Sequence, residues 1–271
     1  MIDFSSVEYR QPNGVLALRN IDLQIKPGEL ISIIGENGAG KTTLIKHING
    51  LLKPSKGIVT VFAVDTRKES IAHLSRKVGI IFQNPDHQLF SESVENEIRF
   101  ALKNFGFQEE IISERLEWAL KSFSLSKYRT TSPILLSGGE KKRLCIAAVL
   151  AWDPDVVVMD EPTVGQDFIQ KEHLTQIIQM LVSKGKTVVI VSHDTEFIWP
   201  LQPRIIVMVG GRIVADGKAK ELFCNKELLK KARLVKPQLL DLSERLGAEP
   251  SDAFSNVNNA KQWIINKFVG E

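Results

Sequence analysis

The chain has few cysteines, little net charge and no long apolar run, and each of these absences narrows the possible functions. Its 271 residues include only two cysteines, Cys145 and Cys224, which lie far apart and outside any CxxC pattern. We therefore expect two buried thiols in a reducing compartment, with no disulfide and no cysteine-ligated metal. The net charge of +3 does not indicate a surface for nucleic acid, so no such partner is expected.

No segment predicts a membrane span or an export signal. The apolar runs fall well short of the roughly 18 residues that cross a bilayer, and the longest, such as 156–159, have the length of sheet strands. Residues 1–4 lack the basic region and apolar core of a signal peptide. A role at a membrane therefore requires another chain to supply the spans. With 43% hydrophobic and 25% charged residues, the chain can bury a full core.

The sequence does contain a phosphate-binding pattern. The apolar run Leu30–Ile34 continues directly into residues 35–43, GENGAGKTT. The glycines let the backbone turn its N–H groups towards a phosphate, and a helix starting near Lys41 adds its positive end. This spacing predicts that Lys41 reaches the β- and γ-phosphates and that the Thr42 hydroxyl ligates Mg²⁺. The residues expected to bind nucleotide here are Asn37, Gly38, Ala39, Gly40, Lys41, Thr42 and Thr43.

Strands and helices alternate around this loop, which predicts an α/β fold. An N-terminal antiparallel hairpin is expected to turn at Asn13 and Gly14. Between 84 and about 135 the apolar residues keep helical spacing, which predicts a helical insertion. After residue 217 narrow apolar stripes predict a C-terminal helical appendage, 218–271, for which packing on its own domain is favoured over dimerisation. Strands are expected at 2–9, 16–25, 30–34, 58–64, 78–82, 156–159, 187–191, 205–209 and 212–215, and helices at 44–50, 141–151 and 168–183.

Three buried strands end in side chains that suit phosphate chemistry. Asp160 and Glu161 follow the strand at 156–159, where Asp160 can hold magnesium and Glu161 can accept a proton from attacking water. Gln83 follows another strand and offers an amide oxygen to the metal. His193 ends the strand at 187–191 and can donate a hydrogen bond to the γ-phosphate. Each of these residues alone is commonly structural, and the phosphate loop upstream favours the catalytic interpretation.

A second anion-binding pattern precedes the helix expected at 141–151. Ser137, Gly138 and Gly139 place a hydroxyl and two glycines in front of that helix, repeating the logic of the phosphate loop. One chain with one phosphate loop has no need of a second such pattern. We therefore hypothesise that it completes the nucleotide site of a partner chain.

Taken together, these motifs resemble those of the nucleotide-binding subunit of an ATP-binding cassette (ABC) transporter. Residues 35–43 match its Walker A motif, Gln83 its Q-loop, 137–139 its signature, 160–161 its Walker B motif, 165–167 its D-loop and His193 its H-loop. The resemblance covers about residues 1–217. It implies a P-loop NTPase (RecA-like) core, ATP as ligand, and Asp167 near the nucleotide. It also implies head-to-tail dimers, with either a second copy of this chain or a related ABC ATPase chain, in which Ser137 and Gly139 contact the ATP of the opposite chain.

A finer resemblance lies in residues 82–90, FQNPDHQLF, and in the C-terminal appendage. Both are similar to the ATPases of energy-coupling factor transporters, which import vitamins and transition-metal ions in prokaryotes. This resemblance implies an integral-membrane coupling subunit, a separate membrane component that binds the solute, and a peripheral location on the cytoplasmic face of the cell membrane. Leu89 and Phe90 are expected in the coupling groove; alternatively, they pack within the insertion.

Three departures from the family pattern and three alternative functions stay open. Gln11, with Tyr9 two residues earlier, stands where an aromatic side chain often stacks on adenine. Glu140 replaces a common Gln in the signature, and Gln166 a usual Leu in the D-loop. The alternatives are an ABC importer of another class for amino acids, metals or lipids, a soluble ABC protein acting on DNA or ribosomes, and a regulatory P-loop protein. The single cassette disfavours the second, and Glu161 with His193 disfavours the third.

Overall fold

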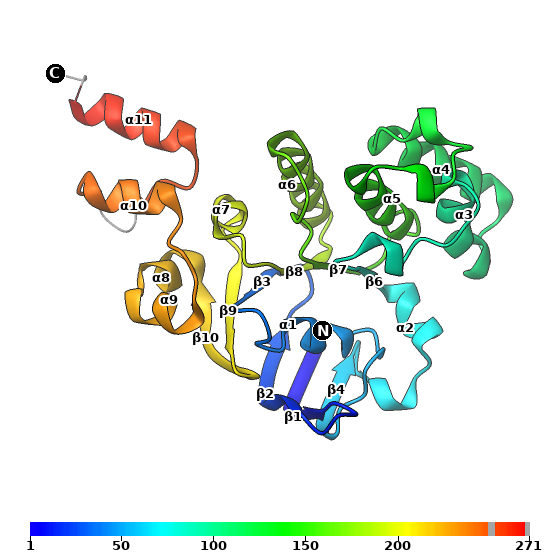
Figure 1. Cartoon of the computed structure of the whole chain (residues 1–271), viewed down its shortest axis with the longest axis horizontal. Helices are drawn as coiled ribbons and strands as arrows, with labels where there is room; N and C mark the ends of the chain where they lie inside the picture. Colours follow the sequence, from blue (N-terminus) through cyan, green and yellow to red (C-terminus); the bar gives the residue numbers. More distant parts are fainter. Residues whose placement is uncertain (249–252, 269–271) are drawn as a thin grey trace.

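The computed structural model describes residues 1–248 and 253–268, and its centre is a six-stranded sheet in the order β10-β9-β3-β8-β7-β6 (Figure 1). Strands β6, β7, β8, β3 and β9 run parallel, and β10 closes one edge antiparallel to β9. Strands β7 and β8 are buried along their whole length, as expected for parallel strands covered on both faces. The bounds are β3 Leu30–Ile34, β6 Val78–Ile81, β7 Val156–Asp160, β8 Thr187–Val191, β9 Arg204–Val209 and β10 Arg212–Lys218.

A smaller antiparallel sheet, in the order β2-β1-β4-β5, faces one side of the central sheet across helix α1 (Lys41–Lys46) (Figure 1). The apolar side chains of both sheets and of α1 form one buried cluster. The expected hairpin of the first two strands is confirmed by their antiparallel pairing. The bounds are β1 Ile2–Arg10, β2 Leu16–Ile25, β4 Lys56–Val61 and β5 Val64–Asp65.

Two local expectations in this region are wrong. The strand expected at 58–64 is interrupted, because Phe62 and Ala63 take positive φ angles of 51° and 64° and turn the chain between β4 and β5. The helix expected to reach Gly50 ends at Lys46, and residues 47–50 form turns. Alternating apolar residues cannot distinguish a continuous strand from two short strands joined by a tight turn.

Helices cover the other face of the central sheet (Figure 1). Helices α3 and α4, which fall within the expected helical insertion at 84–135, form a lobe at one end together with α5, and α6 and α7 lie over the middle. Their buried side chains join those of the sheet in a second cluster. The bounds are α2 Ile71–Lys77, α3 Val94–Asn104, α4 Glu109–Ser122, α5 Gly138–Leu150, α6 Phe168–Ser183 and α7 Thr195–Ile198, with 3-10 turns at Thr66–Lys68, Pro85–His87, Ser126–Tyr128, Pro133–Leu135 and Trp199–Leu201.

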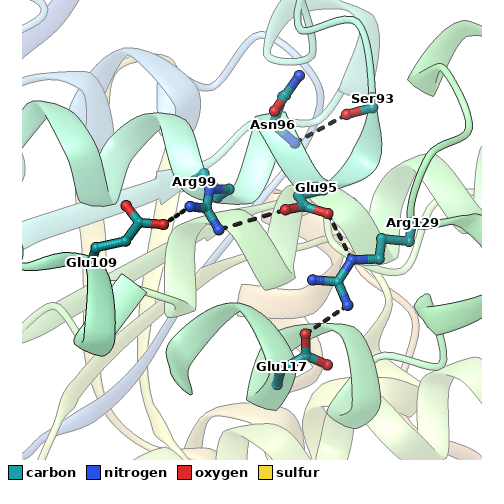
Figure 2. Close-up of polar contacts among 7 residues, drawn as sticks. All are labelled: Ser93, Glu95, Asn96, Arg99, Glu109, Glu117 and Arg129. Atoms are coloured by element: carbon teal, nitrogen blue, oxygen red, sulfur yellow. Dashed lines mark hydrogen bonds and ion pairs between the residues drawn. The ribbon is translucent and has the colours of Figure 1, made fainter. Parts of the chain in front are cut away.

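Charged side chains fasten the lobe together (Figure 2). Glu95 of α3 accepts a hydrogen bond of 2.6 Å from Arg129 and faces Arg99 one turn further along its own helix at 3.5 Å. Arg129 also donates to Glu117 of α4 at 2.6 Å, and Arg99 pairs with Glu109. Because each arginine bridges two carboxylates, the helices share one network rather than isolated pairs, and we expect α3, α4 and the segment before α5 to move as a unit.

The C-terminal helices extend from the β10 edge of the central sheet (Figure 1). Phe223 and Leu229 are buried in the same cluster as the central sheet, and the indole of Trp199 donates to the Phe254 carbonyl at 2.6 Å. The appendage therefore packs on its own chain, while the boundary at residue 217 stays a prediction. Across 1–248 and 253–268 no helix combines the length and apolarity of a bilayer span. The bounds are α8 Ala219–Cys224, α9 Lys226–Ala232, α10 Gln238–Arg245 and α11 Val257–Phe268.

The two cysteines differ in their burial. Cys145 in α5 is fully buried, as expected, and burial raises the pKa of its thiol to about 12. Cys224 at the end of α8 is only partly buried, so the expectation of two buried thiols is wrong for this residue. Its exposure follows from its place at the last position of a short surface helix.

Candidate functional site

The register of three neighbouring parallel strands brings distant segments to one edge of the sheet. Ile33 of β3 and Asp160 of β7 both pair with Val191 of β8, so the carboxyl ends of these strands are level. The phosphate loop leaves β3, Glu161 follows β7, and His193 follows β8. Ligands of open α/β sheets bind at this edge.

The phosphate loop wraps around the buried side chain of Lys41. The Lys41 ammonium donates to the carbonyls of Gly35 and Glu36 at 2.8 and 2.9 Å. Burial lowers its pKa, while the charges of Glu161, Asp160 and Glu36 act in the opposite direction. These two hydrogen bonds hold the amine at the base of the loop.

Thr42 and Asp160 meet directly beneath the loop. The Thr42 hydroxyl donates to the Asp160 carboxylate, at 2.9 Å to Oδ2 and 3.2 Å to Oδ1. Asp160 is almost fully buried; burial raises its pKa, and the hydrogen bond from Thr42 partly opposes that shift. A hydroxyl and a carboxylate in contact form an oxygen donor set that suits Mg²⁺.

Glu161 and His193 form a second pair at the same edge. The Glu161 backbone has a φ of 45°, and its N–H donates to the Val191 carbonyl at 2.8 Å. Oε1 lies 2.9 Å from Nδ1 of His193, whereas Oε2 is buried without a hydrogen-bond partner. Buried polar atoms are rarely left unpaired, so this oxygen is suited to bind a water or substrate group.

Three members of these pairs, Thr42, Glu161 and His193, line a cavity of about 500 Å³. Lys41, Thr42, Gln83, Glu161 and His193 line it, so the structure brings together the predicted residues of the loop and of three strand ends. The full lining is Gln11, Val15, Leu16, Ala17, Arg19, Asn37, Gly38, Ala39, Gly40, Lys41, Thr42, Thr43, Gln83, Glu161, His193, Gly210 and Gly211.

Five predicted residues lie outside that lining: Asp160, which contacts the lining residue Thr42, and Ser137, Gly138, Gly139 and Asp167. Ser137 caps α5 and its hydroxyl donates to Glu140 at 2.8 Å, while Asp167 caps α6 by accepting from the Gln170 N–H at 2.8 Å. The capping explains why α5 starts at Gly138 and not at Lys141 as expected. Hydrogen bonds from Tyr128 and Ser137 hold the pKa of the Glu140 carboxyl at about 2.

The wall of the cavity formed by the β1–β2 hairpin and the β9–β10 turn contains residues, such as Arg19, that the motifs do not indicate. Gln11 lines the cavity, whereas the Tyr9 ring packs edge-on against His47 with centroids 5.0 Å apart. Arg19 and Gly211 also line it, and the Arg19 N–H donates to the Gly211 carbonyl at 2.8 Å. This wall depends on contact between β2 and the β9–β10 turn, and the only local signal for it was the glycine pair of the second hairpin.

Comparison with known proteins decides the family. The family model described as ABC transporter matches residues 18–164, more than half of the chain. The chain belongs to the ABC transporter family. The resemblance drawn from its motifs and the expected fold class are both confirmed. As a member of this family it binds and hydrolyses ATP.

Relatives narrow the class within the ABC family. The energy-coupling factor transporter ATP-binding protein EcfA of Methanothermobacter thermautotrophicus is 41% identical over 248 residues, which are 91% of this chain and 80% of that protein. Some relatives are longer: the chain spans 62% of EcfA2 of Methanospirillum hungatei, at 41% identity and 91% coverage of this chain. These relatives confirm the expectation that the chain is an ATPase of the energy-coupling factor class.

Solved structures of ABC proteins share the fold. CbiO1 of Clostridium perfringens, described as part of the ABC transporter complex CbiONQ, is 34% identical with a TM-score of 0.74, covering 90% of this chain and 98% of its own. The ATP-binding cassette MJ0796, solved as a dimer in a post-hydrolysis state with ADP and Pi, is 30% identical with a TM-score of 0.73, covering 80% and 98%.

Two glycines of the phosphate loop form a matched test of the loop geometry. Gly40 has a φ of 96°, and a Cβ there would lie 2.7 Å from the Ala17 carbonyl oxygen; Gly38 has a φ of 81° and open space around it. Gly38→Ala should cost only backbone strain, about 1–2 kcal/mol, or roughly 2–8 °C in Tm. Gly40→Ala should lower the Tm further because of the added clash. Thermal unfolding without nucleotide measures both, and equal Tm values would contradict this geometry.

Proposed function

We propose that the chain is the ATP-hydrolysing subunit of an energy-coupling factor importer, and that two cassettes close around two ATP molecules and drive uptake of a vitamin or transition-metal ion. The observation that carries the proposal is that one cavity is lined by Lys41, Thr42, Glu161 and His193 together. It combines a cation for the phosphates, an oxygen donor for a metal and a carboxylate with one unpaired oxygen. These are the groups that phosphoryl transfer to water requires.

The donor set at Thr42 fits a magnesium ion. Thr42 and Asp160 already place a hydroxyl and a carboxylate in contact, and the exposed Gln83 side chain lines the same cavity. In our proposal these three residues hold Mg²⁺, which when bound neutralises charge on the β- and γ-phosphate oxygens. Burial raises the pKa of Asp160, and a cation bound beside this carboxylate would offset the cost of burying its charge.

The remaining residues act on phosphate and water. Lys41, held by two loop carbonyls, is positioned to bind the β- and γ-phosphates with little reorganisation. Glu161 accepts the proton of the attacking water at its free Oε2. His193 contacts Glu161 through Nδ1, which fixes the ring, and in the doubly protonated form of the ring Nε2 can donate to a γ-phosphate oxygen. The backbone N–H groups of residues 37–43 supply further donors to the phosphates.

Dimerisation explains the residues outside the cavity. Ser137, Gly138 and Gly139 start α5 at the lobe and do not line the chain's own nucleotide cavity. A head-to-tail partner would bring this signature over the nucleotide of the opposite chain, with Asp167 beside it. The dimeric state of the structurally similar MJ0796 cassette supports this arrangement.

The apolar surface after Gln83 supports docking on a membrane subunit. The Phe90 side chain is 65% exposed and packs edge-on against the exposed Phe100, with ring centroids 4.7 Å apart. Leu89 is partly buried against the core, as in the alternative interpretation. We propose that Phe90 and Phe100 contact an integral-membrane coupling subunit, with a separate membrane component binding the solute, and that the chain lies on the cytoplasmic face of the cell membrane. The similarity to CbiO1, part of a transporter complex, supports this.

The role of Glu161 is tested by Glu161→Gln. The amide keeps the shape of the side chain but cannot accept a proton, so hydrolysis should slow by about 10²–10⁴-fold. ATP binding should be retained, because Lys41 and the loop are unchanged. Steady-state phosphate release and fluorescent ATP binding measure the two effects. Glu172→Gln, an exposed carboxylate on α6, is the control, and undiminished turnover in Glu161→Gln would overturn the assignment.

Sharing of the site is tested by mixing two inactive variants of this chain. Lys41→Ala damages the phosphate loop and Ser137→Ala the signature, so each variant alone has two damaged sites. In a head-to-tail dimer, one chain of each kind forms one intact site, and the mixture should regain up to about a quarter of wild-type activity if the chains pair at random. Lys41→Ala mixed with Thr42→Val is the control without an intact site. A mixture no more active than its components would contradict the shared site.

A further inference from the structure

Helix α5 carries a buried lysine that the reaction described above does not use. Lys142 is only 2% exposed, and its ammonium donates to the carbonyls of Phe82 and Gln83 at 2.9 and 3.2 Å. Burial of a cation is costly unless hydrogen bonds compensate for the lost water. The acceptors here are two backbone carbonyls just past the end of β6, so Lys142 holds the start of the loop that contains Gln83.

Two more contacts fasten the same loop to α5. Lys141, the preceding residue, pairs with Asp86 at 2.8 Å. Gln88 accepts from the Phe82 N–H at 3.2 Å and donates to the Cys145 carbonyl at 3.4 Å. The segment from Phe82 to Gln88 is therefore tied to the first two turns of α5 at three places.

These ties connect the two halves of the proposed dimeric machinery. The signature residue Ser137 caps the N-terminus of α5, whereas the Gln83 side chain lines the chain's own nucleotide cavity. A shift of α5 caused by the partner's nucleotide must displace the carbonyls that Lys142 holds, and with them Gln83. The ion-pair network of the lobe also holds the segment that leads to the signature, because Arg129 of that segment pairs with Glu95 of α3 and Glu117 of α4.

We propose that Lys142 is a positioning residue that couples the two ATP sites, by fixing Gln83 in one site to the signature helix that closes on the other. The inference rests on the proposed dimeric function. In that function, ATP bound by one chain contacts the signature of the neighbouring chain and displaces the neighbour's α5. Lys142 of the neighbour then transmits this displacement to Gln83 in the neighbour's own ATP site. The Lys141–Asp86 pair supports the same connection from the surface.

The test is ATP hydrolysis by the full chain, in the assembly in which it is active, over a range of ATP concentrations. Wild type should hydrolyse cooperatively, with a Hill coefficient above one. Lys142→Met keeps the length of the side chain but removes its donors, and should bring the Hill coefficient to about one and lower kcat by roughly 3- to 30-fold. Lys142→Arg restores donors and should recover part of the cooperativity. Lys103→Met, an exposed lysine on α3, is the matched control and should behave as wild type.

The outcomes separate a coupling role from a purely structural one. Unchanged ATP affinity of the isolated Lys142→Met chain, with lost cooperativity, supports the proposal. A folded Lys142→Met chain with the wild-type Hill coefficient and kcat overturns it. If Lys142→Met does not fold, the Lys141–Asp86 pair provides the test. Lys141→Asp should reduce the Hill coefficient, and the double variant Lys141→Asp with Asp86→Lys should restore it. An unchanged Hill coefficient in Lys141→Asp, or a reduced one that the double variant does not restore, overturns the proposal. A non-cooperative wild type with no gain from mixing variants refutes the dimeric function itself.

Discussion

The level ends of β3, β8 and β7 are the constraint on which the rest of the site depends. Val191 pairs with both Ile33 and Asp160, and its carbonyl also accepts the Glu161 N–H. A slip of one residue in either pairing would turn Asp160 away from Thr42 and Glu161 away from His193, because neighbouring residues of a strand point to opposite faces. The positive φ of Glu161 shows that this register is maintained at the cost of local strain.

Buried charge is the second feature of the site. The side chains of Lys41, Asp160 and Lys142 are almost fully buried. Burial lowers the pKa of both lysines and raises that of Asp160, which in each case favours the neutral form. Carbonyl groups hold both lysines, and Thr42 holds Asp160, so each group keeps its orientation. Such preorganised groups in a partly dry site act more strongly on a polyphosphate than the same groups in water. The unpaired Glu161 oxygen stands out against this background of satisfied groups.

Sequence patterns predicted the central sheet well and selected residues that the structure brings to one cavity, because both depend on local signals. Apolar runs of four or five residues predicted the buried strands. The spacing of residues within the phosphate loop, and the position of the acidic residues directly after a strand, indicated the site. The errors arose where distant contacts or turn geometry decide, as at Phe62 and Ala63, where positive φ angles break a strand. Helix α2, which buries little besides Leu74, gave no clear pattern. Arg19 and the carbonyl partners of Lys142 could not be predicted, because both depend on tertiary contacts between segments far apart in sequence.

The central claim is that hydrolysis is shared, with the signature of one chain acting on the ATP held by another. Its most direct test is a structure of the Glu161→Gln protein with ATP and Mg²⁺ bound. The account predicts that the Ser137 hydroxyl leaves Glu140 and donates to a γ-phosphate oxygen of the ATP held by Lys41 of the neighbouring chain, at a normal hydrogen-bond distance of about 2.5–3.0 Å. A nucleotide-loaded structure in which Ser137 still donates to Glu140 and contacts no phosphate would contradict the account.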